Sequence, residues 1–197
     1  MITVGVTGGI GAGKSRSARI LSSLGIALVD TDDLAREVVL PGTAGFAAVL
    51  GEFGKEIVSE EGQIDRLKLG EIVFRDTKAR QCLEQILHPR IQAAWKQWLE
   101  AQRQTGRPLA LVVIPLLFEK EYGADFDVTV SVACTAETQH LRLSMRGWSD
   151  QQIGLRLNAQ LAIGEKIRRS RYVVWNEGSP ECLRDQWLRV LQAICPG

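Results

Sequence analysis

The sequence lacks a strong excess of either charge and lacks a long apolar run. Its 24 basic and 23 acidic side chains leave a formal net charge of +1, which argues against a polyanion-binding surface as the main function. The longest apolar run, at residues 109–118, is shorter than the about 20 residues that cross a bilayer, and Pro115 interrupts it. We therefore expect neither nucleic acid nor a membrane as a partner.

The chain also has few cysteines, and their spacing excludes two common functions. Cys82, Cys134, Cys182 and Cys195 lie too far apart for a zinc-ligand pattern or a redox pair. We expect reduced thiols, mostly in the core. The amino terminus leads directly into an apolar strand pattern and a glycine loop, without the features of a signal peptide, so we expect a cytoplasmic protein.

What the sequence does contain is typical of one globular domain in which strands alternate with helices. The chain has 197 residues, of which 45% are hydrophobic and 24% charged. Alternation of strands and helices predicts an α/β fold with a parallel central sheet between helical layers. Apolar strand patterns occur at residues 2–6, 26–29, 109–114, 127–133 and 172–175, and an amphipathic helix begins at Pro180.

Helical signals fill two segments between these strands. Residues 34–87 show short helices, with Asp65 and Asp76 as plausible caps, and this segment resembles an insertion. Pro89 at a first helical position predicts the start of a longer helix. The sequence Ser149-Asp-Gln-Gln152 has the spacing of a capping box, so we expect a helix at 153–161 and a helical hairpin around an exposed Gly147-Trp148.

The segment Gly8-Gly-Ile-Gly-Ala-Gly-Lys-Ser15 matches the phosphate-loop pattern G-x-x-x-x-G-K-[ST] between a predicted strand and a predicted helix. Glycines leave the backbone N–H groups free to face phosphate oxygens. Lys14 can reach the terminal phosphates, and the Ser15 hydroxyl can ligate a bridging magnesium ion. The pattern predicts a site for a nucleoside triphosphate.

Residues outside this loop narrow the class of reaction. The GTPase strings Asp-x-x-Gly after a strand and Asn-Lys-x-Asp do not occur, and Pro115 stands where a motor ATPase usually carries its acidic metal ligand. The nearest carboxylates are Asp30 and Asp32, at the end of the second strand. Phosphoryl transfer to an alcohol needs a carboxylate that orients the hydroxyl, and Asp32 is the candidate base. Alternatively, Asp32 caps the next helix and pairs with Arg36, although Asp33 can do that instead.

At this point the chain resembles the dephospho-coenzyme A kinase family, which phosphorylates the ribose 3′-hydroxyl of dephospho-coenzyme A with ATP and so completes coenzyme A biosynthesis. The resemblance runs nearly end to end. It is carried by Thr7–Ser15, Asp30-Thr-Asp32, Ala35-Arg36 with Pro41-Gly42, Leu87-His88-Pro89, Ile114–Glu119, Asn158-Ala-Gln160 and Asn176-Glu-Gly178. A different small-molecule kinase, for a nucleoside or a short alcohol, is the alternative.

The resemblance implies a three-layer P-loop kinase fold with three parts. These are a core at about residues 1–31, 87–137 and 165–197, a helical substrate-binding insertion at 32–86, and a helical lid at 138–164. It also implies ATP and Mg²⁺ as cofactors, dephospho-coenzyme A as the small-molecule substrate, and a monomer or weak homo-oligomer.

Site residues follow from the loop and the resemblance together. The catalytic residues are expected to be Asp32, Lys14 and Arg142, and Ser15 is the metal ligand. The nucleotide is expected to contact Gly9, Gly11, Ala12, Gly13, Lys14, Ser15, Arg16 and Arg146, and the acceptor Asp32, Arg36, His88, Pro115, Leu116 and Glu119.

Some of these assignments have structural alternatives. Arg142 and Arg146 are one turn apart on a single predicted helical face and can clamp the triphosphate, or they are solvated surface charges. His88 can instead cap the helix that begins at Pro89.

The chain departs from the family pattern at a few positions. Arg16 stands where threonine is usual, Ser170-Arg171 replaces Ala-Asp, and Trp175 replaces an aspartate before Asn176. We expect activity to survive these changes, because neither Ser170-Arg171 nor Trp175 touches the glycine loop or Asp32. Arg16 replaces a small hydroxyl side chain near the nucleotide, so we expect some change around adenine binding.

Overall fold

The computed structural model describes residues 1–195 and divides the chain into two compact units. The first unit joins Met1–Asp30 to the described residues from Ala101 onward, and the second is Thr31–Glu100. No helix among residues 1–195 combines the length and the apolar character needed to cross a membrane.

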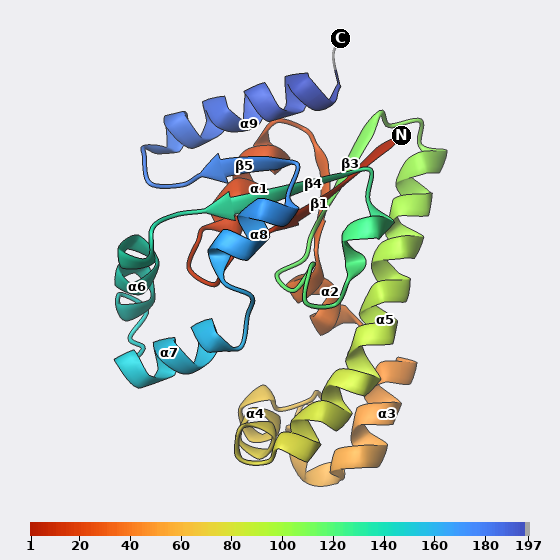
Figure 1. Cartoon of the computed structure of the whole chain (residues 1–197). Coiled ribbons are helices and arrows are strands. Elements are labelled where there is room, and N and C mark those ends of the chain that lie inside the picture. The colour runs from red at the N-terminus through yellow and green to blue at the C-terminus, as the bar shows by residue number, and fades with distance from the viewer. Residues whose placement is uncertain (196–197) are drawn as a thin grey trace. The chain divides into compact units, whose positions relative to one another are not determined.

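The first unit is built on a five-stranded parallel sheet, which confirms the predicted fold class (Figure 1). Its strands lie in the order β2-β3-β1-β4-β5, so the central strand is the one that leads into the glycine loop. Because all five strands run the same way, their carboxyl ends meet at one edge, where open α/β sheets bind ligands. The strands are β1 (Ile2–Thr7), β2 (Ala27–Asp30), β3 (Leu109–Val113), β4 (Val128–Ala133) and β5 (Tyr172–Trp175).

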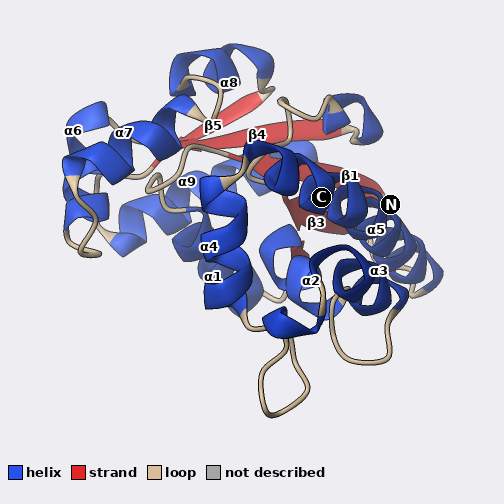
Figure 2. Ribbon diagram, turned by 90° about the horizontal axis from the view of Figure 1, so that it is seen from below, coloured by secondary structure: helices blue, strands red, loops and turns tan. Residues whose placement is uncertain are grey.

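One face of the sheet carries an apolar core against two helices. Alternate strand residues, Val4 and Val6 among them, pack with Leu21 of α1 (Lys14–Ser23) and with Trp187 of α9 (Pro180–Ile194). The opposite face is covered in part by α8 (Ile163–Arg169), whose backbone accepts a hydrogen bond from Ser131 of β4. Figure 2 shows α8 on one side of the strands and α1 and α9 on the other. Burial on both faces explains why the strands are nearly continuous apolar runs.

A helical hairpin follows β4 and agrees with the capping signals in the sequence. Helix α6 (Ala136–Ser144) begins at the N-cap Thr135, and α7 (Asp150–Asn158) begins at a complete capping box on Ser149. The prediction of an exposed Trp148 was wrong, because this side chain is half-buried under the Arg156 guanidinium, 4.2 Å from the ring centre. Helix α8 (Ile163–Arg169) was not predicted from the sequence, and α7 ends at Asn158, earlier than the predicted end at residue 161.

The second unit is helical and has its own small core. The helices are α2 (Thr31–Glu37), α3 (Ala44–Phe53), α4 (Arg66–Arg75) and most of α5 (Thr77–Gln104), and short 3₁₀ turns occur at Lys55–Ile57 here and at Tyr122–Asp125 in the first unit. Val49, Phe53, Ile57 and Leu69 form the buried centre. Asp65 and Asp76 accept backbone hydrogen bonds at the starts of α4 and α5, as predicted.

The prediction that Pro89 starts a helix was wrong. Helix α5 runs without interruption from Thr77 to Gln104, with Pro89 in its interior. An internal proline removes one backbone hydrogen bond at a cost of about 3 kcal/mol. After Pro89, Trp95 and Leu99 are buried, and before it Leu83, Ile86 and Leu87 are partly buried against the core of the second unit. Packing of this kind outweighs a local helix-breaking signal. His88 therefore lies within a helix and does not cap one.

A carboxylate joins the start of α6 to the end of β5. Glu177 accepts hydrogen bonds from the Thr135 backbone N–H at 2.6 Å and from the Trp175 indole N–H at 2.9 Å. Hydrogen bonds from Thr135, and smaller contributions from Thr138 and Trp175, lower the pKa of Glu177 to about 2 from 4.5. This carboxylate therefore stabilises the junction in its ionised form.

This pKa shift predicts how the stability of the fold depends on pH. A carboxyl group whose pKa is lowered by folding stabilises the protein above its unfolded value of 4.5, and this stabilisation disappears as the pH falls toward about 2. Thermal melts of Glu177→Gln should therefore show a lower Tm than the wild type at neutral pH and a smaller difference in acid. An equal decrease in Tm at every pH would show that the charge of Glu177 is unimportant.

Candidate active site

The glycine loop between β1 and α1 has a backbone that other residues rarely adopt. Gly11 and Gly13 have φ values of 78° and 102°. Gly13 is the N-cap of α1 and supplies no capping side chain, so the first N–H groups of α1 are left for a ligand. The loop therefore has the local geometry of an anion site.

The loop glycines are also required by close packing. A Cβ atom on Gly8 would lie 2.3 Å from the Val132 carbonyl oxygen, and one on Gly13 would lie 1.8 Å from the Asn176 side-chain nitrogen. A Cβ on Gly9 would lie 2.6 Å from the Gln139 amide nitrogen. The bare backbone is thus held against β4, α6 and the residue after β5.

Lys14 extends back over the loop rather than into solvent. Its Nζ atom donates to the carbonyl oxygens of Gly8 at 2.8 Å and Gly9 at 3.1 Å. The ammonium group therefore lies on the same stretch of backbone that is expected to surround the phosphates. This position suits a cation that neutralises phosphate charge.

Arg142 on α6 lies against the loop, as the clamp prediction requires, but Arg146 does not share its helix. The Arg142 guanidinium lies 3.3 Å from the Ala12 carbonyl oxygen and donates to the Asn176 carbonyl oxygen at 2.6 Å. Arg146 follows the C-cap Met145 and is exposed, so the predicted common helical face was wrong. The buried Asn176 adds a hydrogen bond from its side-chain amide to Ala12 at 2.8 Å.

Two glutamines that the sequence analysis did not assign to the site hold the middle of the loop. Gln160 accepts a hydrogen bond from the Ile10 N–H at 3.0 Å, and Gln139 donates to the Ile10 carbonyl oxygen. Gln160 stands in a motif that carries the family resemblance, but Gln139 has no signal in the sequence. A cavity of about 330 Å³ opens here, lined by Gly9, Gln139 and residues from Leu157 to Ile163.

The Pro115–Glu119 segment follows β3 at the same edge of the sheet. Its Pro115 carbonyl oxygen accepts a hydrogen bond from the Thr7 hydroxyl, 3.2 Å away at the base of the loop. Leu116 and Glu119 are partly exposed. The structure therefore brings this predicted acceptor segment next to the phosphate loop.

Asp32, Arg36 and His88 belong to the second unit, so their predicted roles stay predictions. Asp32 lies in the first turn of α2 and is exposed. The alternative role, pairing with Arg36, is filled by Asp33, whose carboxylate lies 3.3 Å from that guanidinium.

The donor set fits magnesium better than a metal held mainly by protein ligands. Among residues 1–195, no cluster of three or more His, Cys, Asp or Glu side chains can hold a metal ion. The Ser15 hydroxyl is exposed in the first turn of α1, directly after the phosphate-binding backbone. Mg²⁺ prefers such an arrangement, with hard oxygen ligands from phosphates, water and few side chains.

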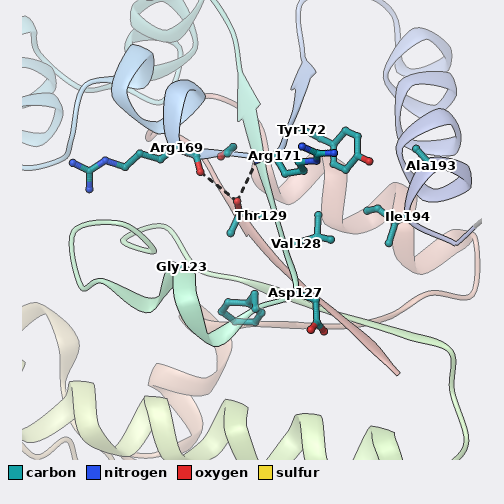
Figure 3. Close-up of a pocket in the computed structure, with 11 residues that line it drawn as sticks. Gly123, Asp127, Val128, Thr129, Arg169, Arg171, Tyr172, Ala193 and Ile194 are labelled. Atoms are coloured by element: carbon teal, nitrogen blue, oxygen red, sulfur yellow. Dashed lines mark hydrogen bonds between the residues drawn. The ribbon is translucent and has the colours of Figure 1, made fainter.

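A second cavity, of about 460 Å³, lies at the amino ends of β4 and β5 (Figure 3). Its acidic residue, Asp127, accepts hydrogen bonds from the Thr3 N–H and hydroxyl, both at 2.8 Å, and these lower the pKa of the carboxyl group. Arg169 in its wall is paired with Glu165 at 2.6 Å. These groups stabilise the fold, and the cavity is at the wrong end of the strands for the chemistry.

The packing of the loop makes a stability prediction with an internal control. Gly13→Ala and Gly25→Ala share the strain of a positive φ, about 1–2 kcal/mol. Only the Gly13 variant also meets a side chain, because Gly25 has open space around it. Gly13→Ala should therefore lower the free energy of unfolding by about 1–3 kcal/mol more than Gly25→Ala, through the displaced Asn176, and should alone weaken ATP binding. Equal losses in denaturant titrations would contradict this account.

Comparison with known proteins identifies the family. The sequence pattern of the dephospho-CoA kinase family matches residues 2–181. A dephospho-CoA kinase from Bdellovibrio bacteriovorus is 39% identical over 189 residues, covering 96% of this chain and 94% of that protein. The solved dephospho-CoA kinase from Campylobacter jejuni is 27% identical, with a TM-score of 0.74 over 98% of this chain and 96% of that one.

The fold is also shared more widely. A shikimate kinase from Acinetobacter baumannii superimposes with a TM-score of 0.52 at 18% identity, over 98% of this chain and 93% of that one, which shows a common fold alone. The phosphate loop, its surroundings and the match over most of the sequence therefore agree, and this chain belongs to the dephospho-CoA kinase family.

Proposed function

We propose that this kinase transfers the γ-phosphoryl group of ATP to the ribose 3′-hydroxyl of dephospho-coenzyme A, with Asp32 as the base. The observation that carries the proposal is the loop itself, whose bare backbone is held against β4, α6 and Asn176 while Lys14 lies across it. This is the geometry of a rigid phosphate site, and family membership supports the choice of acceptor.

The phosphate end of the reaction is assigned to the loop and the α6–α7 hairpin (residues 136–158). The backbone of Gly9, Gly11, Ala12 and Gly13 receives the phosphates, Lys14 neutralises their charge, and Ser15 would hold Mg²⁺, which supplies further charge stabilisation when bound. Arg142 lies against the loop and is the better placed of the two lid arginines, since Arg146 lies past the end of α6. Arg16 is exposed in the first turn of α1 and is proposed to contact the nucleotide.

The acceptor end is assigned to the residues predicted from the sequence. Asp32 orients the ribose 3′-hydroxyl and accepts its proton as the hydroxyl oxygen bonds to the γ-phosphorus and the bond to the bridging oxygen of ADP breaks. Arg36 and His88 are proposed to contact the acceptor as well. Pro115, Leu116 and Glu119 contact it from the segment after β3, which Thr7 ties to the loop.

The proposed division into core, insertion and lid is supported by the separation of the chain into compact units. The boundary after Asp30 lies within one residue of the predicted end of the first core segment, while the second boundary lies within α5. The α6–α7 hairpin, within the predicted lid, would exclude water, which otherwise competes as the phosphoryl acceptor. We also propose a monomer or weak homo-oligomer, which light scattering would test.

The proposal for Asp32 can be tested against its neighbour. Asp32→Asn keeps the shape but removes the base, so kcat for dephospho-coenzyme A should decrease by about 10²–10⁴-fold while ATP affinity changes little. Asp33→Asn is the matched control, because this carboxylate pairs with Arg36 on the surface, and its kcat should change far less. A coupled assay for ADP measures both variants.

The choice of acceptor is tested in the same assay. With MgATP, dephospho-coenzyme A should give ADP and a 3′-phosphorylated product. If nucleosides or short alcohols release ADP and dephospho-coenzyme A does not, the alternative small-molecule kinase becomes the correct assignment. If Asp32→Asn retains full activity, another group accepts the proton.

A further inference from the structure

Lys166 on α8 is a fully buried lysine that no step described so far uses. The exposed fraction of the Lys166 side chain is 0%, although it stands in a charged stretch of the sequence. Arg168 and Arg169, which follow it, are exposed and pair with Glu165. Burial lowers the pKa of Lys166, opposed by the hydrogen bond and charge of Glu119. A lysine placed in such surroundings requires a specific set of partners.

These partners belong to the segment after β3. The Nζ atom of Lys166 donates to the Pro115 carbonyl oxygen at 2.6 Å and lies 2.7 Å from the Oε1 atom of Glu119. The backbone carbonyl of Lys166 accepts a hydrogen bond from Ser131 at 3.1 Å, which fixes the lysine to the central sheet. One side chain thus fixes both ends of the Pro115–Glu119 segment.

The same segment is connected to the phosphate loop by two routes. The Pro115 carbonyl oxygen also accepts from Thr7 at the base of the loop, and the Glu119 Oε1 atom also accepts from the Leu161 N–H at 2.9 Å. The residue before Leu161 is Gln160, which accepts from Ile10 inside the loop. The polar contacts therefore form a closed ring from the loop through Gln160 and Leu161 to Glu119, Lys166, Pro115, Thr7 and back.

One oxygen of the Glu119 carboxylate takes no part in the hydrogen bonds of this ring. The Oε2 atom is buried and has no hydrogen-bond partner among the described residues, whereas Oε1 has two. A buried carboxylate oxygen without a donor is unfavourable, so its orientation has to be imposed by the groups that hold Oε1. Lys166 and the Leu161 N–H are those groups.

Stability alone does not account for the pair. A buried ion pair often stabilises a protein no better than apolar residues of the same volume, because both charges lose their hydration. Unlike an apolar side chain, Lys166 fixes the orientation of the Glu119 carboxylate and of the Pro115 carbonyl group.

We propose that Lys166 is a positioning residue for phosphoryl transfer: through Pro115 and Glu119 it sets the Pro115–Glu119 segment relative to the phosphate loop, so that this segment can receive dephospho-coenzyme A. This inference deepens the proposed function, because it rests on the assignment of that segment to the acceptor. Lys166 touches neither reacting group and acts through Glu119 and Pro115.

The test compares Lys166→Met with a matched core variant. Lys166→Met keeps most of the length and removes the charge, so kcat/KM for dephospho-coenzyme A should decrease by about 10- to 100-fold, mainly through KM. The KM for ATP, and the slow hydrolysis of ATP without acceptor, should stay near the wild-type values. Leu183→Ala, a buried change on α9 at the opposite face of the sheet, should lower Tm without raising the KM for dephospho-coenzyme A.

A double variant separates positioning from folding. Glu119→Gln alone leaves the buried Lys166 charge without its partner and should lower Tm, whereas Lys166→Met with Glu119→Gln removes both charges and should recover part of it. If Lys166 positions the acceptor, the double variant regains stability but keeps a high KM for dephospho-coenzyme A. Recovery of both Tm and KM would overturn the proposal, because the pair would then serve folding only.

One further variant distinguishes a failure of the role proposed for Lys166 from a failure of the proposed function. Leu116→Ala changes the acceptor segment without touching the ion pair. A raised KM for dephospho-coenzyme A in Leu116→Ala but not in Lys166→Met would overturn the role of Lys166 and leave the segment's assignment intact. An unchanged KM in both variants would overturn the two together.

Discussion

The structure of the active edge depends on the close approach of one bare stretch of backbone to its surroundings. Gly8 and Gly13 lie so near Val132 and Asn176 that no Cβ atom fits, and the positive φ values of Gly11 and Gly13 turn the chain into the first turn of α1. A rigid anion site needs its N–H groups in place before the ligand binds, and here packing rather than the ligand supplies that order.

Different forces hold the face of the sheet under α1 and α9 and the edge formed by the carboxyl ends of the strands. On the face covered by α1 and α9, the core is apolar, and the hydrophobic effect that stabilises it does not depend on the orientation of the groups. At the carboxyl edge, directional polar contacts replace it, from Arg142 to Asn176 and from Lys166 to Glu119. Hydrogen bonds fix angles as well as distances, so the parts of the site are positioned by the contacts that specify geometry most narrowly.

The sequence was sufficient where the signal is local and insufficient where it depends on tertiary contacts. Strands, the phosphate loop and the caps Ser149, Asp65 and Asp76 were predicted because a few neighbouring residues encode them. Pro89 was wrongly taken as a helix start, because the packing of Trp95 and Leu99 that keeps α5 helical is distant in sequence. Lys166 was missed because it stands in a run of charges that is typical of a solvated surface, and only its partners across the fold show that it is buried.

The departures from the family pattern lie where the structure can absorb them. Ser170 shares a hydrogen bond with Ser131 at 2.7 Å, and the Trp175 indole donates to the same Glu177 carboxylate that holds the start of α6. Arg16 extends from an exposed position on α1. Each of these side chains has a partner nearby or lies exposed, and none of them belongs to the polar ring that runs from the loop through Glu119 and Lys166. The loop contacts and the Lys166 pair form in the presence of these residues, because none of them supplies a hydrogen bond within that ring.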